Sequence, residues 1–164
     1  MNTELSRLLI EGRSSIHPIE GEAKGLSGEA DVAMTDGRLD LEPPPVGHLE
    51  FPVEGLRSGN MLQDFETMRR LEAKKSPIVS ADLRRVILEP GSPDRYRIDA
   101  DLTFHGLTRR IAVDATAQLG ESQAVLESEF TFDVTAFDVK PPSFLGLSVR
   151  PEVKVRVRLV LDAV

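Results

Sequence analysis

The chain contains no cysteine and no tryptophan, and it has one tyrosine and three histidines among its 164 residues. The absence of cysteine excludes disulfide bonds, thiol catalysis and cysteine-ligated metals, but it does not decide the cellular compartment. His17, His48 and His105 lack the spacing of a helical metal site, which favours solvated or turn-capping imidazoles over a metal centre. We therefore expect neither a metal nor a cofactor.

Long apolar runs and an excess of positive charge are also missing. Near the amino terminus the apolar run Leu8-Leu9-Ile10 is flanked by Arg7 and Glu11, and it is too short for a signal peptide or a membrane span. We expect a cytoplasmic protein without stable membrane insertion. The chain has 20 Lys and Arg against 27 Asp and Glu, a net charge of −7. That sign disfavours nucleic acid and anionic membranes as general partners.

What the chain does contain is alternation of apolar and polar residues, which is typical of strands with one dry face and one wet face. Strands are expected over residues 8–17, 28–34, 38–41, 48–54, 80–88, 96–104, 111–119, 126–134 and 149–161. Asp36-Gly37 and His105-Gly106 supply hairpin turns. The pattern predicts a single domain over residues 1–164, an antiparallel, lipocalin-like β-barrel of about eight strands.

One segment changes period. Its apolar residues follow helical spacing, at Met61, Leu62, Phe65, Met68 and Leu71. Ser58 or Asn60 can cap the start of this helix. We expect the face formed by Met61, Phe65 and Met68 to pack on the barrel mouth, where methionines also suit a lid over a lipid.

Charged residues offer one further candidate site. Arg84-Arg85 and Arg109-Arg110 could bind an anionic head group, but pairing with Asp99, Asp101 and Asp114 on the outer face is the favoured interpretation. The sequence shows no nucleophile motif, phosphate loop or dinucleotide fingerprint. We therefore expect a protein that is not an enzyme.

Several residues expected on the inner face of the barrel are small. They are Ala30, Ala81, Ala100, Ala115, Ala117 and Ser128. Small residues leave volume, and an apolar volume favours an apolar ligand. The alternative is a narrower barrel in which the same alanines pack against each other.

The hairpin Leu102-Thr103-Phe104-His105-Gly106-Leu107-Thr108-Arg109-Arg110 closely resembles the "LTxHGxTR" motif of the YceI-like family of polyisoprenoid-binding, lipocalin-like barrels. The segment 56–60 with Asp64, the segment 76–78 and the closing strand 149–161 resemble further family motifs, in the same order. Gln63 departs from the family pattern, which has Arg at this position.

The resemblance implies an apolar, lipid-like small molecule as partner, such as a polyprenyl phosphate or a quinone, sequestered in the barrel. A stress-related or partner-binding barrel with a filled core is the alternative, and a homodimer is left open. The expected ligand-binding residues are Val79, Ala81, Leu83, Ile98, Ala100, Leu102, Phe104, Ile111, Val113, Ala115, Phe130, Phe132, Phe65 and Met68.

Overall fold

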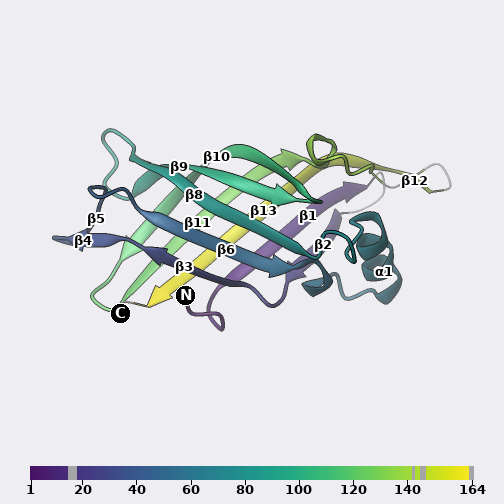
Figure 1. Cartoon of the computed structure of the whole chain (residues 1–164), viewed down its shortest axis with the longest axis horizontal. Helices are drawn as coiled ribbons and strands as arrows, with labels where there is room; N and C mark the ends of the chain where they lie inside the picture. Colours follow the sequence, from purple (N-terminus) through teal and green to yellow (C-terminus); the bar gives the residue numbers. More distant parts are fainter. Residues whose placement is uncertain (15–17, 142, 145–146, 163–164) are drawn as a thin grey trace.

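The computed structural model describes residues 1–14, 18–141, 143–144 and 147–162, and it shows one curled antiparallel sheet with a short helix at one end (Figure 1). The expected fold class, a mainly β antiparallel barrel-like sheet with one α-helix, is confirmed. The strands are β1 Arg7–Ser14, β2 Pro18–Ala23, β3 Ser27–Asp31, β4 Ala33–Thr35, β5 Arg38–Asp40, β6 Val46–Pro52, β7 Leu56–Arg57, β8 Ile78–Leu88, β9 Arg95–Phe104, β10 Leu107–Leu119, β11 Gln123–Asp133, β12 Ser143–Phe144 and β13 Leu147–Asp162. The helical segments are η1 Val53–Gly55, α1 Met61–Arg70 and η2 Val134–Phe137.

The strand order along the sheet is β3-β6-β8-β9-β10-β11-β13-β1-β2-β7, and β12 pairs with β13. Helix α1 lies at one end of the curl, here called the helix end. The β4–β5 hairpin lies at the opposite end, here called the hairpin end, and its turn at Asp36-Gly37 is as expected (Figure 1). The long strands therefore run between the helix end and the hairpin end.

The hairpin of β9 and β10 turns at His105-Gly106, as predicted. Both residues have positive φ, 52° and 75°, and Phe104 pairs with Leu107 beside them. The His105 ring also joins this turn to two other elements of the helix end. Its Nδ1 lies 2.9 Å from the carbonyl oxygen of Phe137, and its Nε2 lies 3.3 Å from Glu72 Oε2.

Pairing between β10 and β11 is partial. It runs from Ala115 opposite Ser128 to Leu119 opposite Ala124. Beyond this ladder β10 pairs with β9 and β11 pairs with β13 up to Asp133. In the described part of the chain, residues 107–114 and 129–133 thus have ladder partners on one side only.

Helix α1 begins at the Asn60 cap, whose side chain accepts hydrogen bonds from two backbone amides of the first turn. Its orientation corrects one expectation, because Met61 and Phe65 are 87% and 69% exposed and do not pack on the sheet. Leu71 is buried directly after the helix, and Met68, three residues earlier, lies on the same side. Helical spacing places Met61 and Phe65 on the same side as Met68, so their exposure shows that the first turns of the helix extend beyond the core and that the last turn packs on it.

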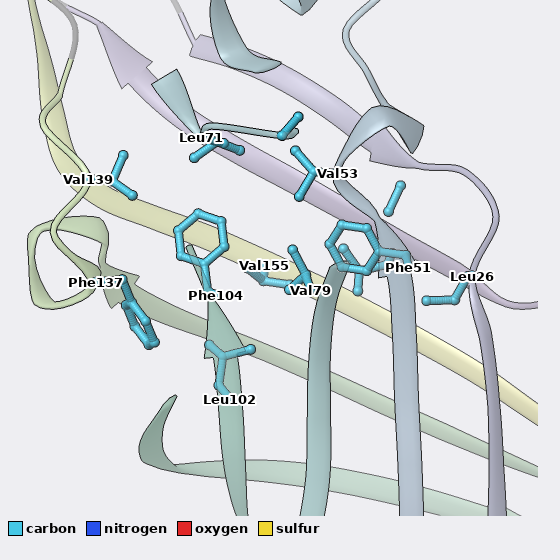
Figure 2. Close-up of a cluster of buried hydrophobic side chains, with 13 residues drawn as sticks. Leu26, Phe51, Val53, Leu71, Val79, Leu102, Phe104, Phe137, Val139 and Val155 are labelled. Atoms are coloured by element: carbon cyan, nitrogen blue, oxygen red, sulfur yellow. The ribbon is translucent and has the colours of Figure 1, made fainter. Parts of the chain in front are cut away.

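The hydrophobic core gathers at the helix end (Figure 2). Three rings pack edge to face there, because Phe104, Phe132 and Phe137 have centroids 5.6 to 5.8 Å apart. The buried cluster consists of Leu8, Ala23, Leu26, Phe51, Val53, Leu71, Ala73, Val79, Leu102, Phe104, Phe137, Val139 and Val155. Packing of this density closes the helix end of the curl.

Candidate functional site

An apolar cavity of about 420 Å³ lies inside the curled sheet. Alternation places every second residue of a strand on its inner face, so nearly every long strand contributes to the lining. The residues that line it include Leu8, Ile10, Leu49, Phe51, Val86, Tyr96, Ala117, Leu126, Val155, Val157 and Leu159.

Most of the residues expected to bind a ligand border this cavity. They are Val79, Ala81, Leu83, Ile98, Ala100, Leu102, Phe104, Ile111, Val113, Phe130 and Phe132. They come from β8, β9, β10 and β11, whose register brings their inner faces together. Their role in binding stays a prediction, since geometry alone places them.

Three expected residues are not part of the lining. Ala115 is 4% exposed but does not border the cavity, and it borders a hollow on the outer face instead. Phe65 faces solvent, and Met68 is partly buried against the hydrophobic core. The helix contributes Thr67 instead, and Leu71 follows it into the lining.

Strands β1 and β13 supply lining residues that the sequence-based set omitted. Leu8 and Ile10 of β1 face the cavity, and Val153, Val155 and Val157 of β13 do the same. Their period-two spacing carries the same signal as that of β9 and β10. The omission came from centring the set on the hairpin motif.

The two ends of the cavity differ in exposure. Near the helix end, the inward side chains of Phe51, Leu102 and Phe104 are 6 to 8% exposed. Near the hairpin end, Leu39 is only partly buried and Val46 is 65% exposed. The hairpin end is therefore less covered than the helix end.

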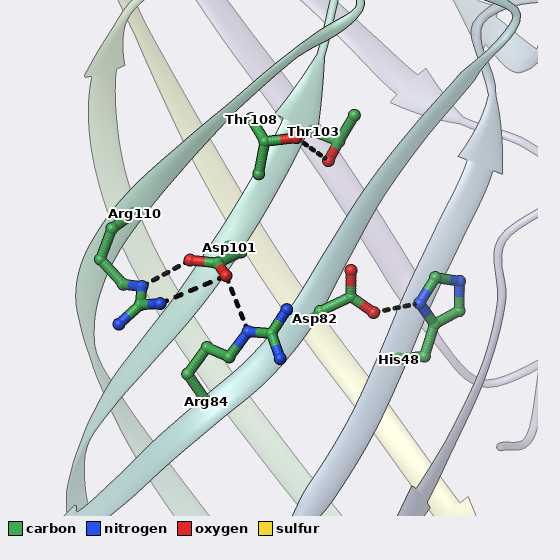
Figure 3. A network of polar contacts seen from close by, with 7 residues as sticks. All are labelled: His48, Asp82, Arg84, Asp101, Thr103, Thr108 and Arg110. Atoms are coloured by element: carbon green, nitrogen blue, oxygen red, sulfur yellow. Dashed lines mark hydrogen bonds and ion pairs between the residues drawn. The ribbon is translucent and has the colours of Figure 1, made fainter.

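The outer face of the sheet carries the charges. Asp101 receives a hydrogen bond from Arg110 at 2.5 Å and one from Arg84 at 2.7 Å, and these hold the pKa of its carboxyl below the usual range (Figure 3). Arg109 donates to the carbonyl oxygen of Ala136 at 3.2 Å. The favoured interpretation of these arginines as outer-face partners of aspartates is confirmed for the Asp101 network.

A hollow of about 650 Å³ also lies on the outer face, near the hairpin end of β10 and β11. Charged side chains dominate its lining, and several of them pair with each other, as Arg158 does with Glu127 at 2.6 Å and Arg156 with Glu129 at 2.9 Å. We regard the smaller internal cavity as the functional candidate because its lining is apolar and most of its side chains are shielded from solvent.

Comparison with protein families gives a match over almost the whole chain. The sequence model of the YceI-like domain matches residues 2–161. This chain belongs to the YceI-like family. Comparison with curated protein sequences gives no match.

Solved structures share this YceI-like fold. BcnA of Burkholderia cenocepacia superimposes with a TM-score of 0.83 at 17% identity, covering 98% of both chains. A polyisoprenoid binding domain from Saccharophagus degradans gives 0.73 at 13% identity, covering 97% of this chain and 94% of that one. The Campylobacter jejuni YceI protein gives 0.73 at 13% identity, covering 92% and 88%.

Within the described ranges, no helix is long and apolar enough to cross a membrane. Across the same ranges, no group of three or more histidine, aspartate or glutamate side chains is arranged to hold a metal ion. His17 lies outside the described residues.

Proposed function

We propose that this YceI-like protein binds an apolar or amphiphilic, lipid-like molecule inside the cavity and carries out no chemistry on it. The observation that supports the proposal is a cavity of about 420 Å³ with an apolar lining inside the sheet. This volume lies within the range of small-molecule sites, about 300 to 1,000 Å³. Burial of apolar surface supplies the affinity, at roughly 25 cal/mol per Å².

The ligand class we propose is an isoprenoid or a similar long-chain molecule. Family membership supports this class, as does the fold shared with the Saccharophagus degradans polyisoprenoid binding domain. The cavity borders residues from Thr67 and Leu71 at the helix end to Leu119 and Leu161 near the hairpin end. A site that follows the strands in this way suits an extended chain better than a compact molecule.

A barrel with a filled core is the weaker alternative. Partly exposed inward residues such as Ile98, Val113 and Leu126 argue against it, because a filled core would bury them.

Native mass spectrometry of the gently purified protein tests the proposal. We expect a bound species with the mass of a lipid. After delipidation, the protein should bind a fluorescent isoprenoid analogue with one-to-one stoichiometry. A protein that carries no lipid and binds no analogue would refute lipid binding and favour the filled barrel.

A further inference from the structure

Tyr96, the one tyrosine of the chain, is buried in the cavity wall without a hydrogen-bond partner. Tyr96 is 2% exposed and borders the cavity. It lies two and four residues before Ile98 and Ala100 on β9, so it shares their inner face of the sheet. Among the described residues, no group forms a hydrogen bond with its hydroxyl. Among the described residues, the fully buried side-chain atoms without a hydrogen-bond partner are Arg70 Nε and His105 Nε2, so the Tyr96 hydroxyl keeps some accessible surface. A hydroxyl that belongs to a lining residue, is accessible and has no partner in the protein is available to a ligand.

The register places a second hydroxyl in the same row of the inner face. Ala115 of β10 pairs with Tyr96 on one side and with Ser128 on the other. Ser128 borders the cavity, and its hydroxyl donates to the carbonyl oxygen of Asp114 at 2.7 Å. Its proton is therefore engaged while its oxygen can still accept.

The charges around the cavity disfavour an anionic ligand. Lysine and arginine side chains are absent from the lining in the described part of the chain, where Met1 contributes the sole amino group. Besides Tyr96, the titratable side chains that border the cavity are Glu29 and His48, and the His48 ring is already paired with Asp82 and Glu50. The segments 31–45, 89–95 and 120–122 at the hairpin end have more acidic than basic residues. The acidic ones are Asp31, Asp36, Asp40, Glu42, Glu89, Asp94 and Glu121, and the basic ones are Arg38 and Arg95. A phosphate or carboxylate entering this end would be repelled and poorly paired.

We infer that the Tyr96 hydroxyl donates a hydrogen bond to an uncharged oxygen of the ligand, so the cavity selects neutral oxygenated apolar molecules over phosphorylated or carboxylated ones. Carbonyl, ether and hydroxyl oxygens fit this role. The inference rests on the proposed function, because it names the ligand class of the same cavity. Tyr96 acts as a specificity-determining residue at the start of β9, near the hairpin end.

The test compares three probes with similar tails: farnesylacetone, which carries a ketone, a saturated or unsaturated hydrocarbon of the same length, and farnesyl monophosphate. Binding to the delipidated full-length protein is measured by calorimetry. Emission of the protein comes from Tyr96 alone, since the chain has no tryptophan, and it reports contact at this residue. The matched variant is Tyr96→Phe, which removes the hydroxyl and keeps the ring.

Wild-type protein should bind the ketone about tenfold more tightly than the hydrocarbon. Tyr96→Phe should abolish this preference and leave the hydrocarbon affinity unchanged, and its melting temperature should equal or exceed that of wild type. The phosphate should bind more weakly than the ketone to both proteins.

Two results would overturn the inference while leaving the proposed function in place. In the first, Tyr96→Phe keeps the preference for the ketone. In the second, wild type binds the phosphate as tightly as the ketone. If none of the three probes binds, the hydrocarbon included, the proposed function itself fails.

Discussion

The Nδ1 atom of His48 on β6 lies 2.8 Å from Oδ1 of Asp82 on the neighbouring strand β8 (Figure 3). On the other side of the ring, Nε2 lies 3.3 Å from Glu50 Oε2. The hydrogen bond with Asp82, followed by the one with Glu50, raises the pKa of His48 above its ordinary value of 6.5. Protonated His48 thus links two carboxylates on the outer face.

We expect this pairing to stabilise the fold at acidic pH. A pKa that is raised in the folded state contributes stability that is complete below 6.5 and is lost as pH rises through the folded value. Asp82→Asn should lower the unfolding free energy more at about pH 5.5 than at about pH 8.5. The effect should stay below about 1 kcal/mol, because His48 and Asp82 are 40% and 43% exposed.

An NMR titration of the His48 imidazole checks the cause. Asp82→Asn should lower the pKa toward 6.5, and Glu50→Gln should lower it less, in line with the order of the two hydrogen bonds. An unchanged pKa in Asp82→Asn would contradict this assignment.

Two alanines on the central hairpin should respond differently to enlargement. Ala100 borders the cavity, so Ala100→Phe should occupy ligand space and weaken binding of a fluorescent isoprenoid analogue, with a small loss of stability. Ala115 does not border the cavity, so Ala115→Phe should overpack the wall and cost about 1 to 3 kcal/mol. Melting curves and binding titrations of both variants separate the two effects, and equal destabilisation would argue for a filled barrel.

The helix should tolerate changes on one side only. Phe65→Ser removes a ring that is 69% exposed, and it should change the unfolding free energy by less than about 0.5 kcal/mol. Leu71→Ala removes a side chain that is 7% exposed and borders the cavity, and it should cost about 2 to 5 kcal/mol. Urea denaturation measures both, and a large loss for Phe65→Ser would mean that this ring is covered in solution.

The cap of the helix offers a further test. The side-chain oxygen of Asn60 accepts hydrogen bonds from the amides of Leu62 and Gln63 at 3.0 and 3.2 Å. Asn60→Ala should cost about 1 kcal/mol and Asn60→Asp should cost little, because aspartate caps as well as asparagine. Denaturation midpoints of the three proteins provide the comparison. If Asn60→Asp is as unstable as Asn60→Ala, capping does not explain the role of this residue.

Other expectations from the sequence keep the status of predictions. They are a single domain over residues 1–164, a cytoplasmic location, the absence of catalysis and a homodimer as an open case. Light scattering and cell fractionation address the oligomeric state and the location. Met61, Leu62 and Phe65 are exposed, so polar substitutions at these positions can be compared with wild type in the light-scattering measurement.

Local patterns explain why the strands, the hairpin at His105-Gly106 and the helix could be predicted. Period-two spacing defines inner and outer faces within one strand, and helical spacing is visible within eleven residues. Family motifs then supplied the order of the elements. These signals depend on residues that are close in the sequence, so they can be recognised without the tertiary structure.

The features that sequence could not provide depend on contacts between distant segments. Leu71 and Ala73 are buried directly after α1, and spacing alone does not reveal how much of the helix reaches the core. Ala115 shares the inward parity of Ile111 and Val113, yet it does not border the cavity. The sequence shows Tyr96 as the one tyrosine of the chain, and only its place in the lining, with no hydrogen-bond partner among the described residues, marks it as a candidate contact for a ligand.

The ladder between β10 and β11 is partial, so the cavity wall has one line along which neighbouring strands are not paired. Residues 107–114 and 129–133 can move apart with no loss of pairing between these two strands in the described chain, since that pairing ends at Ala115 and Ser128. Ile111, Val113, Phe130 and Phe132 lie along these stretches and border the cavity. We therefore expect a bulkier guest to separate the sheet along this line first, while the ladders from β3 to β9 keep their registers.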